Sequence, residues 1–587
     1  MGEVNLTPSA VVARVLVDAL VRCGVTDAVL APGSRSAALA LALAAAERSG
    51  DLTLHVRVDE RSAGYLALGL AKRSRRAVPV FVTSGTAVAE LLPAMVEASF
   101  SGVPLIAVTA DRPVELLKTG ANQTIDHVGI FGSSTRMAAD LPAPEQVGDR
   151  ALRVVQSVIS RAVAAACDPF DPGPAHINVS FRDPLVPGYD EQPGGVELAV
   201  LSDPSITVDA RLTAAMVLPI DEAGIGPIPA RGVVVVGDPI DDESREAAAE
   251  LAEACGWPLI CEPSGLPAVD SDALIAHASL LLADAEFRAR MRPDLVVSVG
   301  RVGLSRGTMR LIASADRHVV VDPRPAVRWA DPLRTARFVL SAVPEPPTEL
   351  EADAEWLQSW RAASDAAEEA VSAVLDDEVT LHAPAVARLV MAQADALGVV
   401  LVGSSWPVRH VEAYALPRDH MPLVVGNRGT SGIDGLLATA WGIAVSHQRD
   451  VPSTAYALVG DLSFLYDING LLAGKGEPRP NLVIVVIDND GGGIFSSLEQ
   501  GDTRFAPDFE RVFGTPHGLD LVAIAQAHGV PARRVTSPHE LVEAIDDAVA
   551  TGGVGVIVAT TGARSDEAGV VRRVQELVSE AIRTGAH

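Results

Sequence analysis

Short runs of apolar residues alternate with longer amphipathic segments over most of the chain. The apolar runs have the length and β-branched content of strands buried on both faces, and the segments between them have helical periodicity. This alternation predicts parallel sheets covered by helices on both sides. The predicted strands are 28–30, 54–58, 78–83, 104–109, 175–180, 232–236, 295–299, 318–321, 399–402, 423–425, 455–459, 482–487 and 555–559. The predicted helices include 9–23, 63–72, 150–167, 464–472, 520–528 and 568–584.

The predicted strands fall into three groups, separated by stretches rich in Pro, Gly, Asp and Glu. A chain of 587 residues is too long for one hydrophobic core. We therefore predict an α/β protein with three doubly wound domains and mainly parallel sheets. Their limits are 1–187 for the first domain, 188–345 for a linker with a short helix and a central domain, 346–380 for a second linker, and 381–587 for the third domain.

Polar residues follow two neighbouring strands of the third group. Asp461 comes soon after one apolar run, and Asn489 follows the next run, with a predicted crossover helix between them. This arrangement brings both to one edge of a sheet, where open α/β sheets bind ligands. Asp461, Asn489 and the carbonyl of Gly491 offer hard oxygen ligands for Mg²⁺ or Ca²⁺. The glycines at 491–493 allow backbone N–H groups to approach a diphosphate closely, although each of these motifs alone is also a common turn signal.

Turns in the first domain carry further candidate residues. Ser34 and Arg35 lie between a strand and a helix, which makes either an anion site at the helix N-terminus or a plain βα turn. Glu60 also follows a strand, where a carboxylate favours the dipole of the next helix. We interpret His127 as a hydrogen-bonded histidine of the core or of a turn.

The charge and composition restrict the classes of partner. The net charge of −28 argues against nucleic acids and anionic membranes. No apolar run reaches transmembrane length, and the N-terminus lacks a signal-peptide pattern, so we expect a cytoplasmic protein without membrane insertion. The cysteines form no CxxC pair, and we expect small buried thiols in a reducing compartment at Cys23, Cys167, Cys255 and Cys261.

The strand-end residues resemble a known cofactor motif. Gly460-Asp461 and then Asn489 after a crossover are similar to the thiamine diphosphate motif. Two longer segments resemble the 2-succinyl-5-enolpyruvyl-6-hydroxy-3-cyclohexene-1-carboxylate (SEPHCHC) synthase family. They are Gly-Asp-Leu-Ser-Phe-Leu-Tyr-Asp-Ile-Asn at 460–469 and Gly-Gly-Gly-Ile-Phe-Ser at 491–496. Leu462 departs from the wider class, which has glycine there, but fits this family. Acidic residues flank Asn489 where an Asn-rich run is usual, which leaves the preferred metal open.

The resemblance implies a pyrimidine-binding first domain, a central domain and a diphosphate-binding third domain. It implies that Glu60 is catalytic and hydrogen-bonds N1′ of the pyrimidine ring, and that Ile433 is the apolar wedge that bends the cofactor. The implied cofactor-binding residues are Glu60, Ser404, Ile433, Gly460, Asp461, Leu462, Ser463, Asn489, Gly491, Gly492, Ile494 and Phe495. The implied ligands of Mg²⁺, or of Mn²⁺ in its place, are Asp461, Asn489 and Gly491.

The same resemblance implies a decarboxylating transferase of menaquinone biosynthesis that joins 2-oxoglutarate to isochorismate. It also implies a homodimer or homotetramer whose active sites lie between chains. The implied substrate residues are Ser34, Arg35, Arg112, Asn122, Gln123, Arg306, Arg409, Arg428, Phe495 and Leu498. Two alternatives are another thiamine diphosphate enzyme, such as an acetolactate synthase-like carboligase or a 2-oxoacid decarboxylase, and a non-catalytic homologue. Arginine is the default cation of this chain, so each arginine also has an alternative reading as an ordinary salt-bridge partner.

Overall fold

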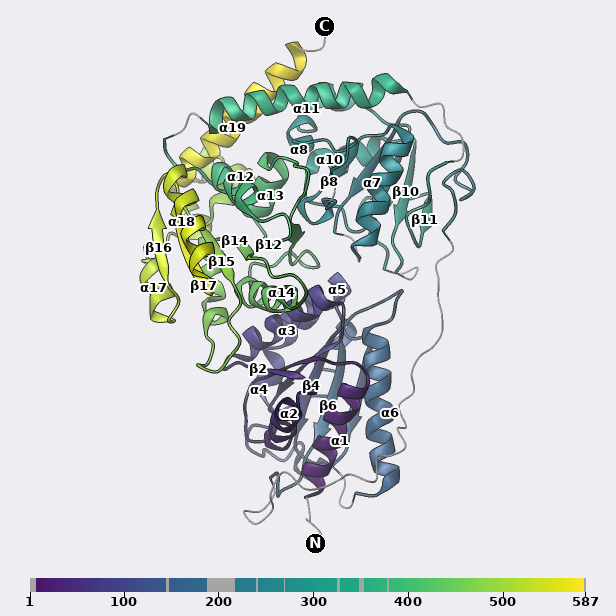
Figure 1. Ribbon diagram of the computed structural model, residues 1–587, viewed down its shortest axis with the longest axis vertical. Coiled ribbons are helices and arrows are strands. Elements are labelled where there is room, and N and C mark those ends of the chain that lie inside the picture. Colours follow the sequence, from purple (N-terminus) through teal and green to yellow (C-terminus); the bar gives the residue numbers. More distant parts are fainter. Residues whose placement is uncertain are drawn as a thin grey trace.

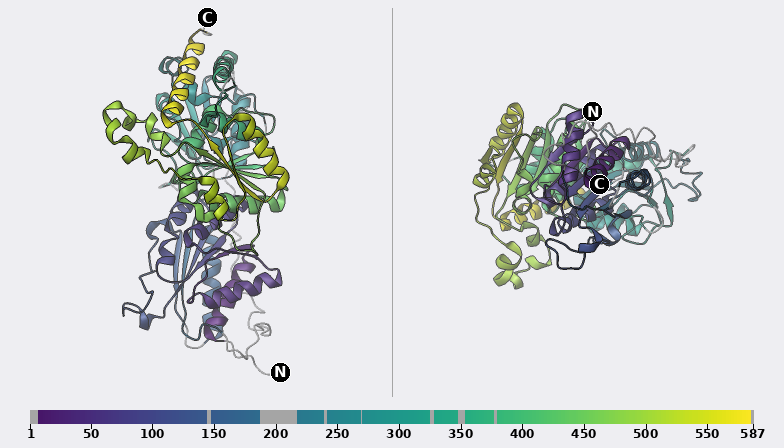
Figure 2. Two further views of the ribbon diagram at one scale, coloured as in Figure 1. Left: turned by 90° about the vertical axis from the view of Figure 1, so that its left-hand side faces the viewer. Right: turned by 90° about the horizontal axis from the view of Figure 1, so that it is seen from below.

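The computed structural model describes residues 7–143, 147–186, 217–238, 241–268, 270–324, 328–347, 353–376 and 379–584. It contains three sheets whose strands are all parallel, with helices on both sides (Figure 1). This confirms the predicted α/β fold. The first sheet forms the lower lobe in Figure 1, the other two lie above it, and Figure 2 shows the same division from the side. Among the described helices, none is long and apolar enough to cross a membrane. Pro187 and residues 188–216 of the first predicted linker lie outside the described residues.

The first sheet has the strand order β2-β1-β3-β4-β6-β5. Its strands are β1 (Asp27–Leu30), β2 (Thr53–Val56), β3 (Val78–Val82), β4 (Leu105–Asp111), β5 (Met137–Leu141) and β6 (Ala175–Ser180). Its helices are α1 (Pro8–Arg22), α2 (Ala37–Ser49), α3 (Glu60–Ser74), α4 (Thr86–Ala89), α5 (Leu92–Ser101) and α6 (Asp149–Ala166). The predicted strand 54–58 is too long, and the predicted helix 63–72 begins too late. The helix starts at Glu60 because the N-cap Asp59 accepts hydrogen bonds from the N–H groups of Arg61 and Ser62.

The middle sheet has the order β11-β10-β9-β7-β8. Its strands are β7 (Gly232–Val236), β8 (Leu259–Cys261), β9 (Leu295–Val299), β10 (Arg317–Val321) and β11 (Phe338–Leu340). The helices around it are α7 (Glu243–Cys255), α8 (Ala278–Leu281), α9 (Ala285–Arg290), α10 (Arg306–Ser314) and α11 (Ala354–Leu375). Within the predicted second linker, α11 buries Trp356 and Trp360 in the core of this domain, and the Trp356 indole N–H donates to the Gly232 carbonyl (2.8 Å).

The third sheet has the order β13-β12-β14-β15-β17-β16. Its strands are β12 (Val399–Val402), β13 (Leu423–Val425), β14 (Ala455–Gly460), β15 (Leu482–Asp488), β16 (Ala532–Val535) and β17 (Val554–Thr560). Its helices are α12 (Ala383–Gln393), α13 (Trp406–Tyr414), α14 (Leu436–Asp450), α15 (Asp461–Tyr466), α16 (Ala506–Phe509), α17 (Leu521–Ala527), α18 (Pro538–Thr551) and α19 (Arg564–Thr584). Strands β14 and β15 are neighbours, as predicted, but the crossover helix between them begins earlier, at Asp461, and a 3₁₀ turn (Ile468–Leu471) follows it.

Helices α3 and α14 join the first and third domains, which meet at the centre of Figure 1. Each helix presents a glycine to the backbone of the other. A Cβ at Gly69 would lie 2.2 Å from the Thr439 carbonyl oxygen, and one at Gly442 would lie 2.3 Å from the Leu66 carbonyl oxygen. The two backbones therefore touch, and the apolar side chains around them form one core shared by both domains.

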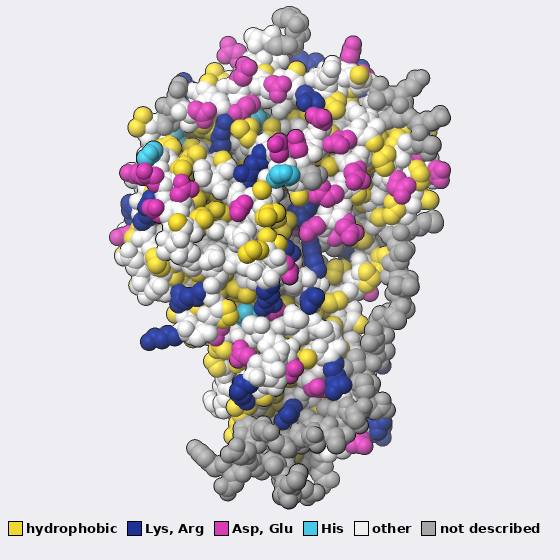
Figure 3. Space-filling model, viewed as in Figure 1, with side chains coloured by type: hydrophobic (Ala, Val, Ile, Leu, Met, Phe, Trp, Pro, Cys, Tyr) yellow, Lys and Arg dark blue, Asp and Glu magenta, His cyan; other side chains and the backbone are white. Residues whose placement is uncertain are grey.

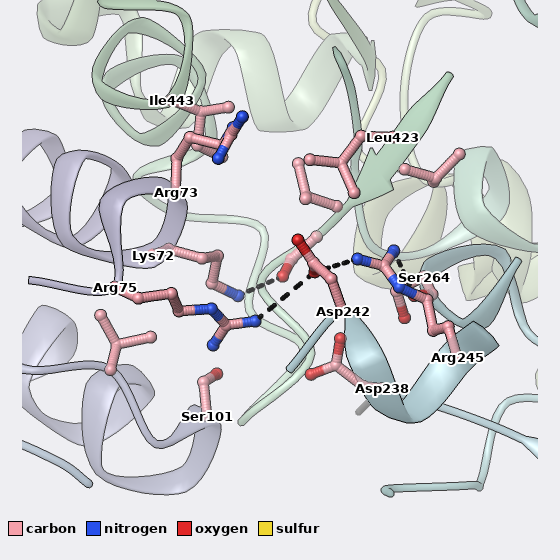
Figure 4. Close-up of a pocket in the computed structure, with 14 residues that line it drawn as sticks. Lys72, Arg73, Arg75, Ser101, Asp238, Asp242, Arg245, Ser264, Leu423 and Ile443 are labelled. Carbon is pink, nitrogen blue, oxygen red and sulfur yellow. Dashed lines mark hydrogen bonds and ion pairs between the residues drawn. The ribbon is translucent and has the colours of Figure 1, made fainter. Parts of the chain in front are cut away.

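Ionic contacts reinforce this contact between domains. Arg449 at the end of α14 pairs with Asp27 of β1. Asp27 Oδ1 also lies 2.9 Å from Nε2 of the buried His55 imidazole. Figure 4 shows a further junction of all three domains, where the Lys72 ammonium donates to the Gly426 carbonyl and Arg75 faces Asp242. One chain thus holds its first and third domains in a fixed relation.

The four cysteines are all free. Cys255 is buried, and Cys23 and Cys261 are partly buried, as the sequence predicts in outline. Cys167 is exposed, so the prediction of a buried thiol is wrong there, because this residue is the C-cap of α6 and lies beyond its packed face. His127 is buried, and its ring nitrogens contact Asn178 Oδ1 (3.0 Å) and the N–H of Gly85 (3.2 Å), which confirms its structural role.

Candidate active site

A cavity of about 150 Å³ lies at the carboxyl ends of β12, β14 and β15. Every described residue that lines it belongs to the third domain. Eleven of the predicted cofactor residues line it together: Ser404, Ile433, Gly460, Asp461, Leu462, Ser463, Asn489, Gly491, Gly492, Ile494 and Phe495. Ser404 Oγ is buried and has no hydrogen-bond partner among the described residues, so it is available to a ligand in this cavity. The structure therefore brings together the residues that the sequence placed after the strands of the third domain.

Asp461 is the buried centre of this cavity. It is the first residue of α15, and its carboxylate accepts the N–H groups of Leu462 (2.6 Å) and Gly491 (2.7 Å). Burial raises the pKa of Asp461 to about 6, and the charge of Asp488 adds to this, while the two N–H donors and His517 act in the opposite direction. A cation bound to this carboxylate would relieve the cost of burying the charge.

His517 is a member of this cluster that sequence reasoning missed. Its Nε2 lies 3.4 Å from Asp461 Oδ2 and 3.7 Å from Asp488 Oδ1, and the three side chains are close enough to surround one ion. His517 Nδ1 accepts the N–H of Leu519 (3.0 Å), whereas Nε2 is buried, faces the two carboxylates and has no hydrogen-bond partner among the described residues. Its turn lies far along the chain from both acids, and no local pattern marks it.

The acids beside Asn489 have structural partners. Asp488 pairs with Arg534 at 3.2 Å. One Asp490 carboxylate oxygen accepts the N–H groups of His517 (2.9 Å) and Gly518 (2.8 Å). Asp490 therefore holds the turn that brings His517 to the cavity, and Asp488 lies between this cluster and Arg534.

The glycine run fits closely against the neighbouring 513–514 backbone. A Cβ at Gly491 would lie 2.0 Å from the Gly514 carbonyl oxygen, and φ is +133° there, so glycine is required. The sequence predicts that the N–H groups of this glycine run are free to bind a diphosphate, but in this structure they are not. The N–H groups of residues 491, 492 and 493 are donated to the side chain of Asp461 and the carbonyls of Gly514 and Gly491 (2.7–2.9 Å). The Gly491 carbonyl retains a second lone pair for a metal ion.

The predicted substrate residues of the first domain form a separate group. Arg112 is buried, and its guanidinium donates to Ser84 Oγ and to the Gln123 carbonyl (2.9 Å). Burial lowers the pKa of Arg112, and the nearby charge of Arg35 lowers it further. Arg35 Nη1 donates to the Phe181 carbonyl (3.1 Å). Ser34, Asn122 and Gln123 are exposed. Two arginines whose charges act on one another favour an anionic ligand.

Glu60 belongs to this first-domain side. Its carboxyl group is half-buried, and burial, Asp59 and Glu90 raise its pKa above the usual value. It does not line the Asp461 cavity of its own chain, in which the described lining residues all come from the third domain. Glu60 and the Asp461 cavity therefore lie in different domains of the chain, which contact each other through α3 and α14.

Arg409 lies next to the Asp461 cavity, and two further arginines influence its charge. Arg409 Nη1 donates to the carbonyl of Ser405 (2.7 Å), which lines the cavity. Desolvation of this guanidinium and the nearby charge of Arg428 lower the pKa of Arg409, and Arg306 of the middle domain adds to the effect. Arg428 itself lines a larger cleft of about 860 Å³ between the domains. Figure 3 shows Lys and Arg side chains gathered at this waist of the molecule.

Leu498 is a predicted substrate residue of the third domain that does not line the cavity. It is exposed beyond the 3₁₀ turn Gly493–Ser497 and is absent from the described lining of the cavity. Phe495 does line it and packs against Phe513, with ring centroids 5.6 Å apart. Leu498 therefore requires a movement of its loop, or a second chain, to reach a substrate.

Comparison with protein families agrees with this division between two domains. Residues 10–130 match the thiamine pyrophosphate enzyme N-terminal TPP binding domain, and residues 405–559 match the C-terminal TPP binding domain. The fold, the cavity and these matches define a thiamine diphosphate (thiamine pyrophosphate) enzyme.

Relatives of known name define the family more narrowly. The chain is 45% identical over 582 residues to the 2-succinyl-5-enolpyruvyl-6-hydroxy-3-cyclohexene-1-carboxylate synthase of Thermobifida fusca, covering 98% of this chain and 100% of the relative. It is 41% identical over 536 residues to the synthase of the same name from Saccharopolyspora erythraea (89% and 91% covered), and 42% identical over 546 residues to that of Kineococcus radiotolerans (92% and 94%). The chain belongs to the SEPHCHC synthase family.

Proposed function

We propose that this protein decarboxylates 2-oxoglutarate and adds the resulting succinyl carbanion equivalent to isochorismate in a 1,4 fashion, which gives SEPHCHC for menaquinone biosynthesis. Bound thiamine diphosphate supplies the carbon nucleophile for the keto carbon of 2-oxoglutarate and accepts the electron pair released with CO₂. The observation that supports the substrate assignment is the position of Arg409, which donates to Ser405 in the lining of the Asp461 cavity while the positive charges of Arg428 and Arg306 act on its guanidinium.

The arginines suit substrates that carry carboxylates. A guanidinium pairs a carboxylate through two parallel N–H bonds, a geometry that lysine cannot reproduce. Because the chain carries a net charge of −28, its long-range field repels anionic substrates, and the attraction must be local. Pyruvate has one carboxylate and needs fewer such partners, so this cluster favours 2-oxoglutarate over the substrate of an acetolactate synthase-like enzyme.

The third domain has the residues to hold a divalent cation and a diphosphate. Asp461 and Asn489 line one cavity with Gly491, and they offer a carboxylate, an amide and a carbonyl oxygen. These hard donors suit Mg²⁺, or Mn²⁺ in its place, with the remaining coordination positions left to the diphosphate. Ile433 also lines the cavity and provides the apolar support for the bend of the cofactor.

Glu60 is the proposed proton-handling residue. A half-buried carboxyl with a raised pKa can hold a proton against N1′ of the pyrimidine ring and release it during the reaction. Because Glu60 does not line the Asp461 cavity of its own chain, the complete site forms between the first domain of one copy and the third domain of another. A homodimer is the smallest such assembly, and a homotetramer can contain two of them. Four free cysteines agree with a cytoplasmic setting.

The direct test is the release of CO₂ from 2-oxoglutarate by the purified protein with thiamine diphosphate and Mg²⁺, with and without isochorismate. We expect rapid consumption of 2-oxoglutarate only when isochorismate is present, and little turnover of pyruvate under either condition. Preferred turnover of pyruvate would support the acetolactate synthase-like alternative. Absence of any turnover by a protein that binds thiamine diphosphate would support the non-catalytic alternative.

A further inference from the structure

Glu97 is a buried carboxylate that connects the first domain to a loop of the third. It lies on α5 and is 1% exposed. Its Oε1 accepts the N–H of Gly429 (2.9 Å) and the hydroxyl of Ser101 (2.6 Å), and its Oε2 accepts the N–H and the hydroxyl of Thr430 (2.7 and 2.8 Å). Burial alone raises the pKa of Glu97, but Lys72 and these donors outweigh it, so the pKa lies below its usual value. The side chain is therefore an anion that accepts hydrogen bonds from four donor groups.

The loop fits against α5 without space for side-chain atoms. A Cβ at Gly429 would lie 2.6 Å from Ser101 Oγ and 2.7 Å from the Glu97 carbonyl oxygen. From the other side, Arg301 of the middle domain donates to the Gly429 carbonyl (2.9 Å). The 426–435 loop, which joins β13 to α14, is thus held near its first half by two other domains.

A second contact from the first domain holds the other half of the loop. The hydroxyl of Tyr65 on α3 donates to Asp434 Oδ2 (2.6 Å). The Tyr65 ring lies where a side chain at Gly435 would be, because a Cβ there would come within 2.0 Å of the ring. Gly435 has φ +66° and is the N-cap of α14, so the ring fixes the point at which the loop becomes helix.

The two contacts flank the functional side chains of the loop. Arg428 directly precedes the residues held by Glu97, and Ile433 directly precedes Asp434. Neither Glu97 nor Tyr65 is among the described residues that line the cofactor cavity, so both act through the loop. We propose that Glu97 and Tyr65 are positioning residues, which set Arg428 for the substrate and Ile433 for the cofactor within their own chain. This inference rests on the roles of Arg428 and Ile433 in the proposed function.

The proposal gives the first domain two tasks in the assembly. It supplies Glu60 to the site shared with another copy, and it shapes the third-domain half-site of its own chain. A carboxylate is needed because all four groups that contact Glu97 are donors. An amide would keep one acceptor oxygen, but its NH₂ group would face two donors, which costs two hydrogen bonds and leaves buried groups unpaired.

The test compares Glu97→Gln with the wild-type protein and a matched control. Thiamine diphosphate affinity in the presence of Mg²⁺ is measured by calorimetry, and kcat and KM for 2-oxoglutarate are measured with isochorismate saturating. The control is Asp284→Asn in the middle domain, a 6% exposed carboxylate that accepts the N–H groups of Glu286 and Phe287 (2.9 Å each) and caps α9. Melting temperatures are recorded for all three proteins.

We expect Glu97→Gln to weaken thiamine diphosphate binding about tenfold or more and to lower kcat/KM for 2-oxoglutarate by a similar factor. Asp284→Asn should lower the melting temperature while both values stay within about twofold of wild type. Glu97→Asp, which keeps the charge on a shorter stem, should recover part of the loss. If Glu97→Gln keeps both values within about twofold while its melting temperature falls as in the control, Glu97 only stabilises the domain contact and the proposal is wrong.

A second variant keeps the test decisive if Glu97→Gln does not fold. Tyr65→Phe removes one hydroxyl and leaves the ring against Gly435. It should also weaken thiamine diphosphate binding by several-fold, and unchanged affinity would contradict the role of Tyr65. Cofactor affinity is independent of the substrate assignment. Failure of the wild-type protein to use 2-oxoglutarate would therefore count against the proposed function, whereas unchanged cofactor affinity in both variants would count against the positioning roles.

Discussion

The crossing of α3 and α14 makes a sharp prediction for Gly442→Ala. The added Cβ would lie 2.3 Å from the Leu66 carbonyl oxygen, 2.8 Å from the Leu70 nitrogen and 3.1 Å from the Gly69 carbonyl carbon. An ordinary contact begins at 3.4 Å. All three atoms belong to the backbone of α3, so no side-chain rotation can relieve the overlap. The two helices must move apart by about 1 Å, which weakens packing along their whole interface.

The expected cost follows from two opposing effects. Forcing a methyl group into a packed site costs about 1 to 3 kcal/mol, and rigid backbone neighbours place this site at the upper end. Replacing glycine by alanine inside a helix returns about 1 kcal/mol. The net loss is about 2 kcal/mol, which lowers the melting temperature of a domain of this size by about 4 to 8 °C.

Differential scanning calorimetry of the purified protein measures this shift. The matched control is Gly569→Ala in α19, where no atom lies within 4 Å of the new Cβ. This control should gain about 0.5 to 1 kcal/mol from helix propensity alone. A Gly442→Ala protein that melts at or above the wild-type temperature would refute the reasoning, because the two backbones could not then be in contact as described.

Three further predictions concern the third domain. Asp461→Ala removes the one charged ligand in the proposed metal set, so calorimetry should show loss of Mg²⁺-dependent thiamine diphosphate binding, and wild-type affinity would rule out the metal role. Arg409→Lys and Arg428→Lys should each cost about 1.5 to 3 kcal/mol in kcat/KM for 2-oxoglutarate or isochorismate while cofactor affinity is kept, and unchanged values for both substrates would make these arginines simple surface cations. Burial raises the folded-state pKa of Asp467 to about 7 from 3.8, so the folded state binds more protons between these values and stability falls as pH rises through that window. Asp467→Asn should therefore lose less stability than wild type between about pH 4 and pH 7 in urea titrations, and equal losses would contradict the shift.

The sheets could be predicted from the sequence where strands are buried on both faces. Strands β6, β7, β9, β12 and β13 have the predicted bounds. Of these, β7, β12 and β13 are continuous apolar runs, whereas polar residues interrupt the apolar ones in β6 and β9. Strands β5, β8, β11 and β16 were not predicted. All four are edge strands: β8 and β11 have only three residues each, and β5 and β16 carry polar residues, as in Ala-Arg-Arg-Val at Ala532–Val535.

The site could be predicted as far as local motifs reach. Asp461 and Asn489 were placed together because neighbouring parallel strands end at one edge of the sheet. His517, Glu97 and Tyr65 were missed because each reaches its partner through a long-range contact, and no local spacing marks such contacts. The glycine run illustrates a further limit, since its composition indicates close approach but not which backbone atom it approaches.

Mixing two inactive variants tests whether the active site is shared between two chains. Glu60→Gln disables the first-domain half-site, and Asp461→Ala disables the third-domain half-site. In a mixed dimer one site combines both substitutions and the other has neither, so random exchange of subunits leaves about a quarter of the sites intact. After verified exchange in equal amounts, we predict recovery of about a quarter of the wild-type rate of 2-oxoglutarate consumption with isochorismate. A mixture that stays as inactive as the separate variants would contradict the shared site.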